Sequence, residues 1–152
     1  MSDLQAATIP ALVVHRTYPA PASRVYEAWT RPELVRQWFQ PGDNPITNVE
    51  MDVRPGGRYR ITFRMQDGED WTVGGVYREV RAPERLSFTW QWEGDEAEML
   101  VTLEFREQGE ATELVLTHER FAEEASRERH GHGWNDGLDK LGAFLEPAKG
   151  SA

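Results

Sequence analysis

From Pro45 to about residue 119, hydrophobic side chains occupy every second position for long stretches of the sequence. The segment 58–65 is the clearest case, because Tyr59, Ile61 and Phe63 alternate with arginine and threonine. A period of two predicts β-strands with one apolar and one polar face. The expected strands are residues 48–53, 58–65, 71–80, 85–92, 98–106 and 112–119. Their short connections leave no room for crossover helices, so they should form an antiparallel meander.

A helical spacing precedes this region, in the segment 22–38, which itself follows an apolar strand expected at 11–18. The apolar positions of the first helix are Val25, Ala28 and Trp29. They lie at i, i+3 and i+4, which predicts one buried helix face, and Ser23 is placed to cap the helix. Thr30, followed by proline and glutamate, predicts a second short helix, because both residues favour a helix start. This helix should end near residue 38, before a Pro-Gly pair.

The last part of the chain is again helical in its pattern. Its apolar positions are Trp134, Leu138, Leu141 and Leu145, at i, i+4, i+7 and i+11. We expect this helix to begin near Gly133. Because one-sided strands need a cover, this long element should lie against the sheet. The sequence therefore predicts an α+β fold of the helix-grip kind, a curved antiparallel sheet wrapped around a long C-terminal helix, with two short helices after the first strand.

The chain of 152 residues is expected to fold as one domain, since this length suits a single hydrophobic core. No repeat or low-complexity linker divides the sequence. We place the domain at residues 8–147. The segments 1–7 and 148–152 are small and polar, and we expect them to be flexible termini.

Composition limits the classes of function. A net charge of −9 disfavours nucleic acid and anionic membrane surfaces as partners, because the protein repels phosphate groups. The absence of cysteine excludes disulfides, thiolate catalysis and cysteine-bound metals. The sequence has no recognisable signal segment and no apolar run of membrane-spanning length. We therefore expect a cytoplasmic protein that does not insert into membranes.

Motifs along the chain resemble the AHSA1-like family (activator of Hsp90 ATPase homologue 1-like). They are Ala22–Leu34 with Gln37–Pro41, Asp52–Gly57, Pro83–Leu86 with Thr89-Trp90, and His130, Gly133-Trp134 and Leu138–Leu141. The resemblance extends from about residue 10 to about residue 146, with the motifs in register.

This resemblance implies the START/Bet v 1-like fold of the SRPBCC superfamily, which agrees with the helix grip expected from the hydrophobic pattern. The superfamily includes lipid and hormone carriers, polyketide aromatases and cyclases, and antibiotic-sequestering proteins, so the resemblance alone implies no activity. The eukaryotic co-chaperone that names the family has a separate Hsp90-binding domain, which is absent from this sequence. An Hsp90-type chaperone is therefore not an expected partner.

Large side chains on the inward faces are candidates for the wall of a ligand cavity between the sheet and the last helix. The same residues would also form a packed core, so the sequence leaves both interpretations open. The candidates are Trp38, Met51, Phe63, Met65, Trp71, Tyr77, Phe88, Trp90, Phe105, His118, Trp134 and Leu138. His118 and Tyr77 are the expected polar anchors. Gly137 and Gly142 are unfavourable inside a helix and would let sheet or ligand approach closely.

No catalytic, phosphate-binding or metal motif is present in the sequence, so we predict no catalytic residue, no metal and no cofactor. His130 and His132 are expected to be exposed at the start of the last helix, where residues two apart point away from each other. The one acid–base alternative pairs His118 with Glu79. It requires the strand at 71–80 to turn Glu79 inward.

Three functions follow from these observations. The first is binding of a small apolar or aromatic molecule, without a catalytic centre. The second is an aromatase/cyclase-like or hydratase-like enzyme that uses His118 and Glu79 on a bound carbonyl. The third is a protein-interaction or stress-response role related to Hsp90 co-chaperones, which needs an exposed apolar patch. The edge strands also leave a homodimer open.

Overall fold

The computed structural model describes residues 9–40 and 43–146. In chain order the elements are β1 (Leu12–Tyr18), α1 (Ala22–Thr30), α2 (Pro32–Trp38), β2 (Ile46–Met51), β3 (Arg58–Arg64), β4 (Asp70–Arg81), β5 (Arg85–Trp92), β6 (Met99–Gln108), β7 (Ala111–Glu119) and α3 (Glu124–Leu145). The strands form one antiparallel sheet in the order β1-β7-β6-β5-β4-β3-β2. The predicted order of elements and the helix-grip architecture are confirmed. Both expected flexible termini and the Pro-Gly pair at 41–42 lie outside the described residues.

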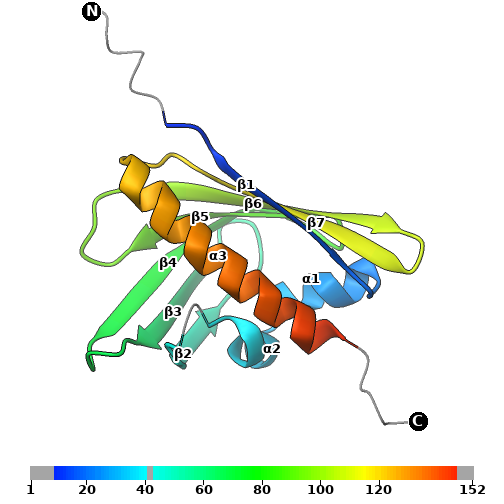
Figure 1. Ribbon diagram of the computed structural model, residues 1–152, viewed down its shortest axis with the longest axis horizontal. Coiled ribbons are helices and arrows are strands. Elements are labelled where there is room, and N and C mark those ends of the chain that lie inside the picture. The colour runs from blue at the N-terminus through cyan, green and yellow to red at the C-terminus, as the bar shows by residue number, and fades with distance from the viewer. Residues whose placement is uncertain (1–8, 41–42, 147–152) are drawn as a thin grey trace, which may run out of the picture.

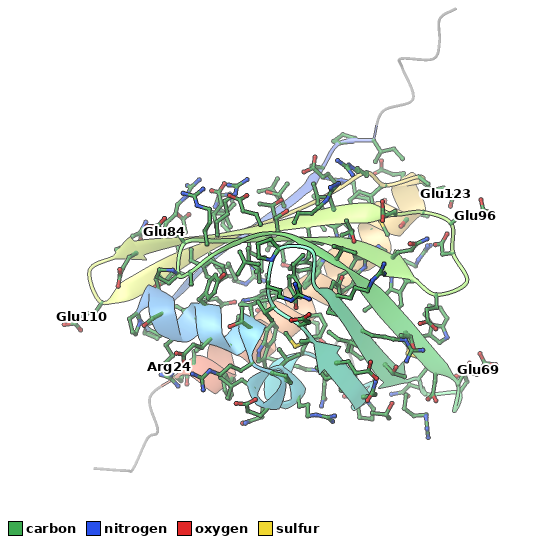
Figure 2. All side chains as sticks on the ribbon, turned by 180° about the vertical axis from the view of Figure 1, so that it is seen from behind. Arg24, Glu69, Glu84, Glu96, Glu110 and Glu123 are labelled. Atoms are coloured by element: carbon green, nitrogen blue, oxygen red, sulfur yellow. The ribbon has the colours of Figure 1, made fainter. Side chains whose placement is uncertain are left out.

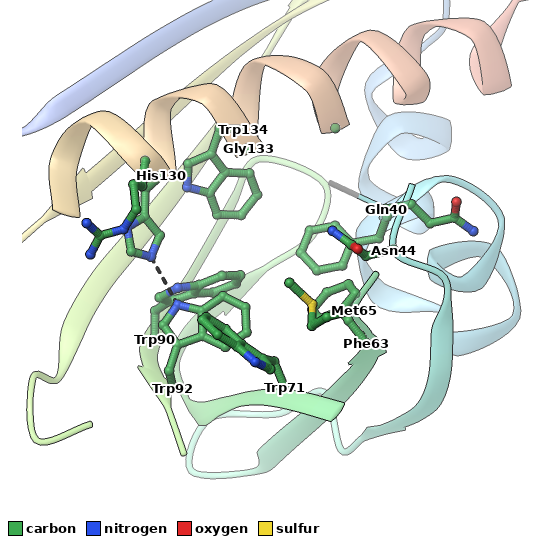
Figure 3. A pocket seen from close by; sticks show the side chains of 13 residues that line it. Gln40, Asn44, Phe63, Met65, Trp71, Trp90, Trp92, His130, Gly133 and Trp134 are labelled. Carbon is green, nitrogen blue, oxygen red and sulfur yellow. Dashed lines mark hydrogen bonds between the residues drawn. The ribbon is translucent and has the colours of Figure 1, made fainter. Parts of the chain in front are cut away.

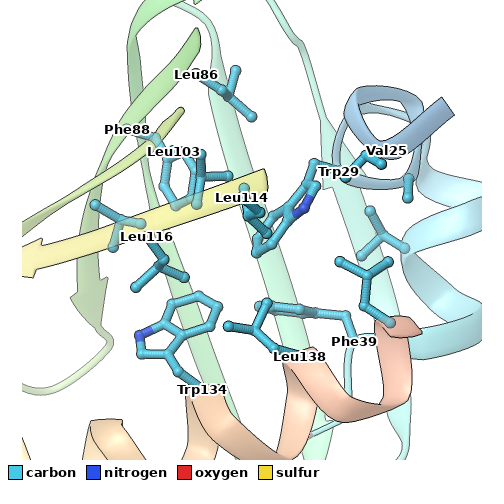
Figure 4. Packing of buried hydrophobic residues seen from close by; sticks show 14 of the residues in the cluster. Val25, Trp29, Phe39, Leu86, Phe88, Leu103, Leu114, Leu116, Trp134 and Leu138 are labelled. Atoms are coloured by element: carbon cyan, nitrogen blue, oxygen red, sulfur yellow. The ribbon is translucent and has the colours of Figure 1, made fainter. Parts of the chain in front are cut away.

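The long helix α3 crosses one face of the curved sheet diagonally, and α1 and α2 lie beside its C-terminal half (Figure 1). The hydrophobic core fills the space between these layers (Figure 4). Leu103, Leu114 and Leu138 are fully buried there. Each such side chain contributes about 1.5–3 kcal/mol through removal of its surface from water, which is why α3 remains on the sheet.

Charged side chains lie on the outside of this core. Figure 2 shows the carboxylates of Glu69, Glu84, Glu96, Glu110 and Glu123 projecting outward from turns and strand ends. Arginines pair with acids across the outer face of the sheet, as in Arg60 with Glu93 at 2.7 Å. The negative net charge is therefore carried mainly by exposed groups, where solvent screens it.

The pairing of β4 with β5 contains an irregularity that decides the direction of several side chains. Tyr77 pairs with Phe88, but Glu79 pairs with Ser87, so Arg78 is an extra residue in β4. A bulge of this kind reverses the alternation of every side chain that follows it. Nearby, a Cβ on Gly75 would overlap the carbonyl oxygen of Thr89, so only glycine allows this close approach of the two strands.

Two expected helix starts are wrong. The helix α3 begins at Glu124 rather than near Gly133, because its first turns are anchored by tertiary contacts instead of by an apolar stripe. Arg127 donates hydrogen bonds to the carbonyl oxygens of Pro10 and Ala11, at 3.0 and 3.3 Å. The helix α1 begins at Ala22 after Pro21, without a side-chain cap. Ser23 therefore lies inside the first turn.

Candidate functional site

A cavity of about 200 Å³ lies between α3 and the strands β3, β4 and β5 (Figure 3). Six aromatic side chains from five parts of the chain make most of its wall. They are Phe39, Phe63, Trp71, Trp90, Trp92 and Trp134. The remaining lining residues are Gln40, Asn44, Met65, Arg129, His130, Gly133 and Gly137. Its lining is thus mostly apolar with a few polar groups, which is the usual composition of a small-molecule site.

The tryptophan rings of the wall pack against one another and hold its shape. The ring centroids of Trp90 and Trp92 are 5.8 Å apart with their planes at 90°, and those of Trp90 and Trp134 are 5.1 Å apart. Trp71 continues this row at 5.9 Å from Trp92, yet 50% of its surface is exposed. Edge-to-face pairs add about 0.5–1.5 kcal/mol each. The wall is therefore preformed, and Trp71 marks its open side.

A fully buried histidine supports the wall from behind. The Nδ1 atom of His118 accepts a hydrogen bond from the indole N–H of Trp134 at 2.9 Å. This contact leaves the proton on Nε2, which faces the sulfur of Met99 at 3.3 Å. Burial, and to a smaller extent the nearby His130, lower the pKa of His118 to about 3. His118 is therefore neutral near pH 7 and orients Trp134.

His130 holds the next tryptophan in the same way. Its Nδ1 atom lies 2.8 Å from the carbonyl oxygen of Ser126 and donates to it. Its Nε2 atom then accepts from the indole N–H of Trp92 at 3.1 Å. Burial is the main cause that lowers the pKa of His130, and the charge of Arg129 adds to it. Each histidine fixes one tryptophan of the wall, and the two imidazole rings lie 4.8 Å apart.

Two of the five α3 residues that line the cavity are glycines and contribute no side chain to it. Gly133 and Gly137 are one helical turn apart and both line the cavity. A Cβ built on Gly137 would meet no atom within 4 Å, whereas one on Gly142 would lie 3.3 Å from the ring of Tyr18. Gly137 and Gly142 therefore differ, because Gly137 borders open space and Gly142 allows the ring of Tyr18 to pack closely against the helix.

We expect Gly137→Ala to raise the free energy of unfolding by about 0.8–1 kcal/mol, because alanine is the better helix former and its methyl group meets open space. Urea denaturation measures this gain. Gly142→Ala is the matched control, since its methyl group must displace the ring of Tyr18 and the gain is offset. Equal gains at the two positions would contradict this assignment of the cavity face.

The segment after α2 forms the end of the cavity opposite the histidines. Lys140 on α3 donates a hydrogen bond from Nζ to the carbonyl oxygen of Gln40 at 2.7 Å, and it also pairs with Asp136 at 3.3 Å. Gln40 and the adjacent Phe39 both line the cavity. The hydrogen bond from Lys140 therefore holds Phe39 and Gln40 against α3.

The structure separates the candidate wall residues into three groups. Those that line the main cavity are Phe63, Met65, Trp71, Trp90 and Trp134. Those that surround a second cavity of about 30 Å³, together with Trp90, are Trp38, Met51, Tyr77 and Phe88. A space of this size holds about one or two water molecules rather than an organic ligand. These four residues do not line the main cavity, and Phe39 and Trp90 line both cavities.

Phe105, Leu138 and His118 line neither cavity and belong to the packed core. The ring of Phe105 packs against Tyr26 of α1 at 5.1 Å. Leu138 is fully buried. His118 contacts the wall through Trp134 and does not itself line the cavity, where the sequence predicted a polar anchor.

The acid–base alternative requires an inward Glu79, but Glu79 points to the outer face. The bulge at Arg78 reverses the alternation of β4 before Glu79. Its carboxylate pairs with Arg85 at 2.7 Å and with Arg81 at 3.1 Å. Hydrogen bonds from Arg85 and then Arg81 lower the pKa of Glu79. Glu79 and His118 therefore do not converge on one site.

Several lining residues were not among the predicted wall residues. Trp92 is two residues after Trp90 in the same strand, so the alternation predicts that both side chains point to the inner face. This pattern was sufficient to predict Trp92 as a wall residue. His130 was expected to be exposed, but its ring is partly buried under Trp92; His132 is exposed as predicted. Phe39 follows the end of α2, where no periodicity indicates direction. The positions of these residues depend on contacts between distant segments.

Within the described ranges, no group of three or more His, Asp or Glu side chains is placed to hold a metal ion. None of the described helices is both long and apolar enough to cross a membrane.

The family comparison agrees with the fold and with the position of the motifs. The model of the family described as "Activator of Hsp90 ATPase homolog 1-like protein" matches residues 19–146. The chain belongs to this family. No curated protein matches it significantly.

Solved structures show the same START-like helix grip. Protein CV1439 from Chromobacterium violaceum is 27% identical, with a TM-score of 0.84 over 91% of this chain and 98% of that one. CalU16 from Micromonospora echinospora is 30% identical, with a TM-score of 0.69 over 92% and 82%. The AHSA1 protein from Silicibacter pomeroyi, at 23% identity and a TM-score of 0.79 over 90% and 97%, shares the fold.

Proposed function

We propose that this protein binds a small aromatic or apolar molecule in the cavity between α3 and β3–β5. The observation that carries the proposal is a preformed wall of tryptophan and phenylalanine rings around about 200 Å³. Large aromatic side chains usually fill a core completely, at the density of organic crystals. Here Gly137 on α3 leaves open space beside them, at some loss of helix stability.

The size of the cavity limits the ligand. An engineered apolar cavity of about 150 Å³ accepts benzene, so about 200 Å³ suits one substituted ring or two fused rings. The opening beside the half-exposed Trp71 would admit a substituent that projects into solvent. A long lipid chain does not fit this space.

One buried donor in the wall favours a ligand with a hydrogen-bond acceptor. The indole N–H of Trp90 is buried and has no acceptor among the described residues. Leaving such a group unsatisfied costs about 1–3 kcal/mol. A ligand oxygen or nitrogen that reached this N–H would recover part of that free energy.

The proposal is tested by blocking the cavity from the helix side. We expect Gly137→Leu to abolish binding of one-ring and two-ring aromatic compounds, because its side chain would occupy the space beside Gly137. Binding is measured by tryptophan fluorescence and by thermal shift across a panel of aromatic compounds. His132→Leu is the control, because it adds the same side chain at an exposed position of α3. Unchanged binding in Gly137→Leu, or no binding by the wild type, would refute the proposal.

The two alternative functions find less support. The enzyme alternative loses its acid–base pair, since Glu79 lies on the outer face. A protein-interaction role calls for a contiguous apolar patch. Among the described residues the large exposed hydrophobics are Val13 and Trp71, and Trp71 belongs to the cavity. We therefore place ligand binding first.

A further inference from the structure

The lining of the cavity has a charge opposite to that of the whole protein. The chain carries 26 Asp and Glu against 17 Lys and Arg. Among the described residues that line the cavity none is acidic, and Arg129 is the single arginine or lysine. Asp95 influences the neighbouring His130 electrostatically but does not line the cavity. An anion in this space would therefore meet one arginine and no carboxylate in the described lining.

Arg129 is placed so that its charge reaches the cavity. Arg129, Gly133 and Gly137 are spaced by four residues along α3, which puts them on one helix face, and all three line the cavity. The two glycines contribute no side chain to this face, and Arg129 is exposed at its N-terminal end. Figure 3 shows Gly133 on the helix directly above the aromatic wall.

Arg129 also has no partner that would occupy its guanidinium. No ion pair or hydrogen bond joins its side chain to any of the described residues. Its neighbour Arg127 differs, because Arg127 pairs with Glu124 at 3.5 Å and donates to the carbonyl oxygen of Pro10 at 3.0 Å. Arg127 therefore anchors the start of α3 to the segment before β1, whereas Arg129 has no such structural contact with the described residues.

His130 cannot supply the charge or the donor instead. Its Nδ1 proton is held by the carbonyl oxygen of Ser126, and its Nε2 atom accepts from Trp92. Both nitrogens are therefore engaged within the protein. Among the described lining residues, the guanidinium of Arg129 is the charged donor that remains for a ligand.

We propose that the ligand is an aromatic monoanion, such as an arene carboxylate, whose ring lies against the tryptophan wall and whose carboxylate pairs with Arg129. This inference rests on the proposed function and adds the charge of the ligand to it. A guanidinium matches a carboxylate with two parallel hydrogen bonds, which orients the ring as well as attracting it. A cationic ligand would find no carboxylate in the described lining.

Three probes with one ring system test the charge preference by isothermal titration calorimetry at low salt and neutral pH: 2-naphthoate, 2-naphthamide and 2-naphthylmethylammonium. In the wild type we expect 2-naphthoate to bind about tenfold more tightly than 2-naphthamide, which corresponds to about 1.4 kcal/mol, and the ammonium probe to bind weakest. Added salt should reduce the advantage of 2-naphthoate.

The variant Arg129→Gln is expected to raise the Kd of 2-naphthoate about tenfold and to leave that of 2-naphthamide unchanged. Arg36→Gln is the matched control, because it removes the same charge from α2, away from the lining of the cavity. We expect it to change neither Kd by more than about twofold.

The outcomes separate this inference from the proposed function. Equal affinity for 2-naphthoate and 2-naphthamide would overturn the anionic ligand while leaving the binding cavity in place. If Arg129→Gln weakened the binding of 2-naphthoate and 2-naphthamide equally, Arg129 would support the cavity structurally. That result would also overturn the anionic ligand. If none of the three probes nor the wider aromatic panel bound to the folded wild type, the proposed function itself would fail.

Discussion

Replacing Trp134 with alanine is expected to lower the free energy of unfolding by about 3–5 kcal/mol, because a large buried ring is removed from the centre of the grip. Trp134 is 4% exposed and packs against Trp90. Its indole N–H also donates to His118, so the variant leaves a buried Nδ1 atom without its donor. Equilibrium denaturation in urea, followed by circular dichroism, measures the loss.

The matched control is Trp71→Ala, which removes the same side chain from the open side of the cavity. Because half of the surface of Trp71 is already exposed, the loss of stability should be about 1 kcal/mol or less. Binding of an aromatic ligand should nevertheless weaken, since Trp71 lines the cavity. Similar losses of stability in the two variants would contradict the assignment of Trp134 to the core and Trp71 to the opening.

The second large effect is a loss of stability in mildly acidic solution, caused by His118. Burial lowers its pKa in the folded protein from 6.5 to about 3. Below about pH 6.5 His118 therefore binds a proton in the unfolded chain but not in the folded protein. The free energy of unfolding falls as the pH falls. The slope approaches about 1.4 kcal/mol per pH unit well below pH 6.5, and the total loss between pH 7.5 and pH 5 is about 2 kcal/mol. Urea denaturation at a series of pH values measures it.

The variant His118→Asn isolates this contribution. The asparagine oxygen can accept the hydrogen bond from Trp134, but the side chain does not titrate. We expect the variant to lose about 1 kcal/mol per pH unit of the wild-type slope between pH 6.5 and pH 5. His130, whose pKa is also lowered, retains its own smaller part. Glu79, Glu93 and Glu104 titrate at lower pH and do not interfere. An unchanged slope would show that His118 is protonated in the folded protein.

Most of the fold could be predicted from the hydrophobic pattern. The alternation of Tyr59, Ile61 and Phe63 with polar residues identifies a strand and its inner face, because successive side chains in a strand point to opposite sides. The same reasoning failed along β4, where the extra residue Arg78 reverses the alternation before Glu79. A bulge has no reliable signal in one sequence, since it depends on the pairing of two strands.

The cavity was predicted only in part. The hydrophobic pattern puts Trp71, Trp90 and Trp134 on inner faces, and all three line the cavity. The direction in which Phe39 and His130 point depends on segments far away in the sequence, such as Trp92 in the case of His130. Their contribution to the wall therefore had no local signal.

The sequence alone determined the class of fold, the order of the elements and the family, because each of these depends on short-range periodicity and on motifs. Tertiary structure decided whether the tryptophan-rich interior is filled or hollow. That outcome depends on where α3 stands over the sheet and on which of its glycines faces empty space: Gly137 does, and Gly142 packs against Tyr18. Both glycines look alike in the sequence, and only the packing of distant segments distinguishes them.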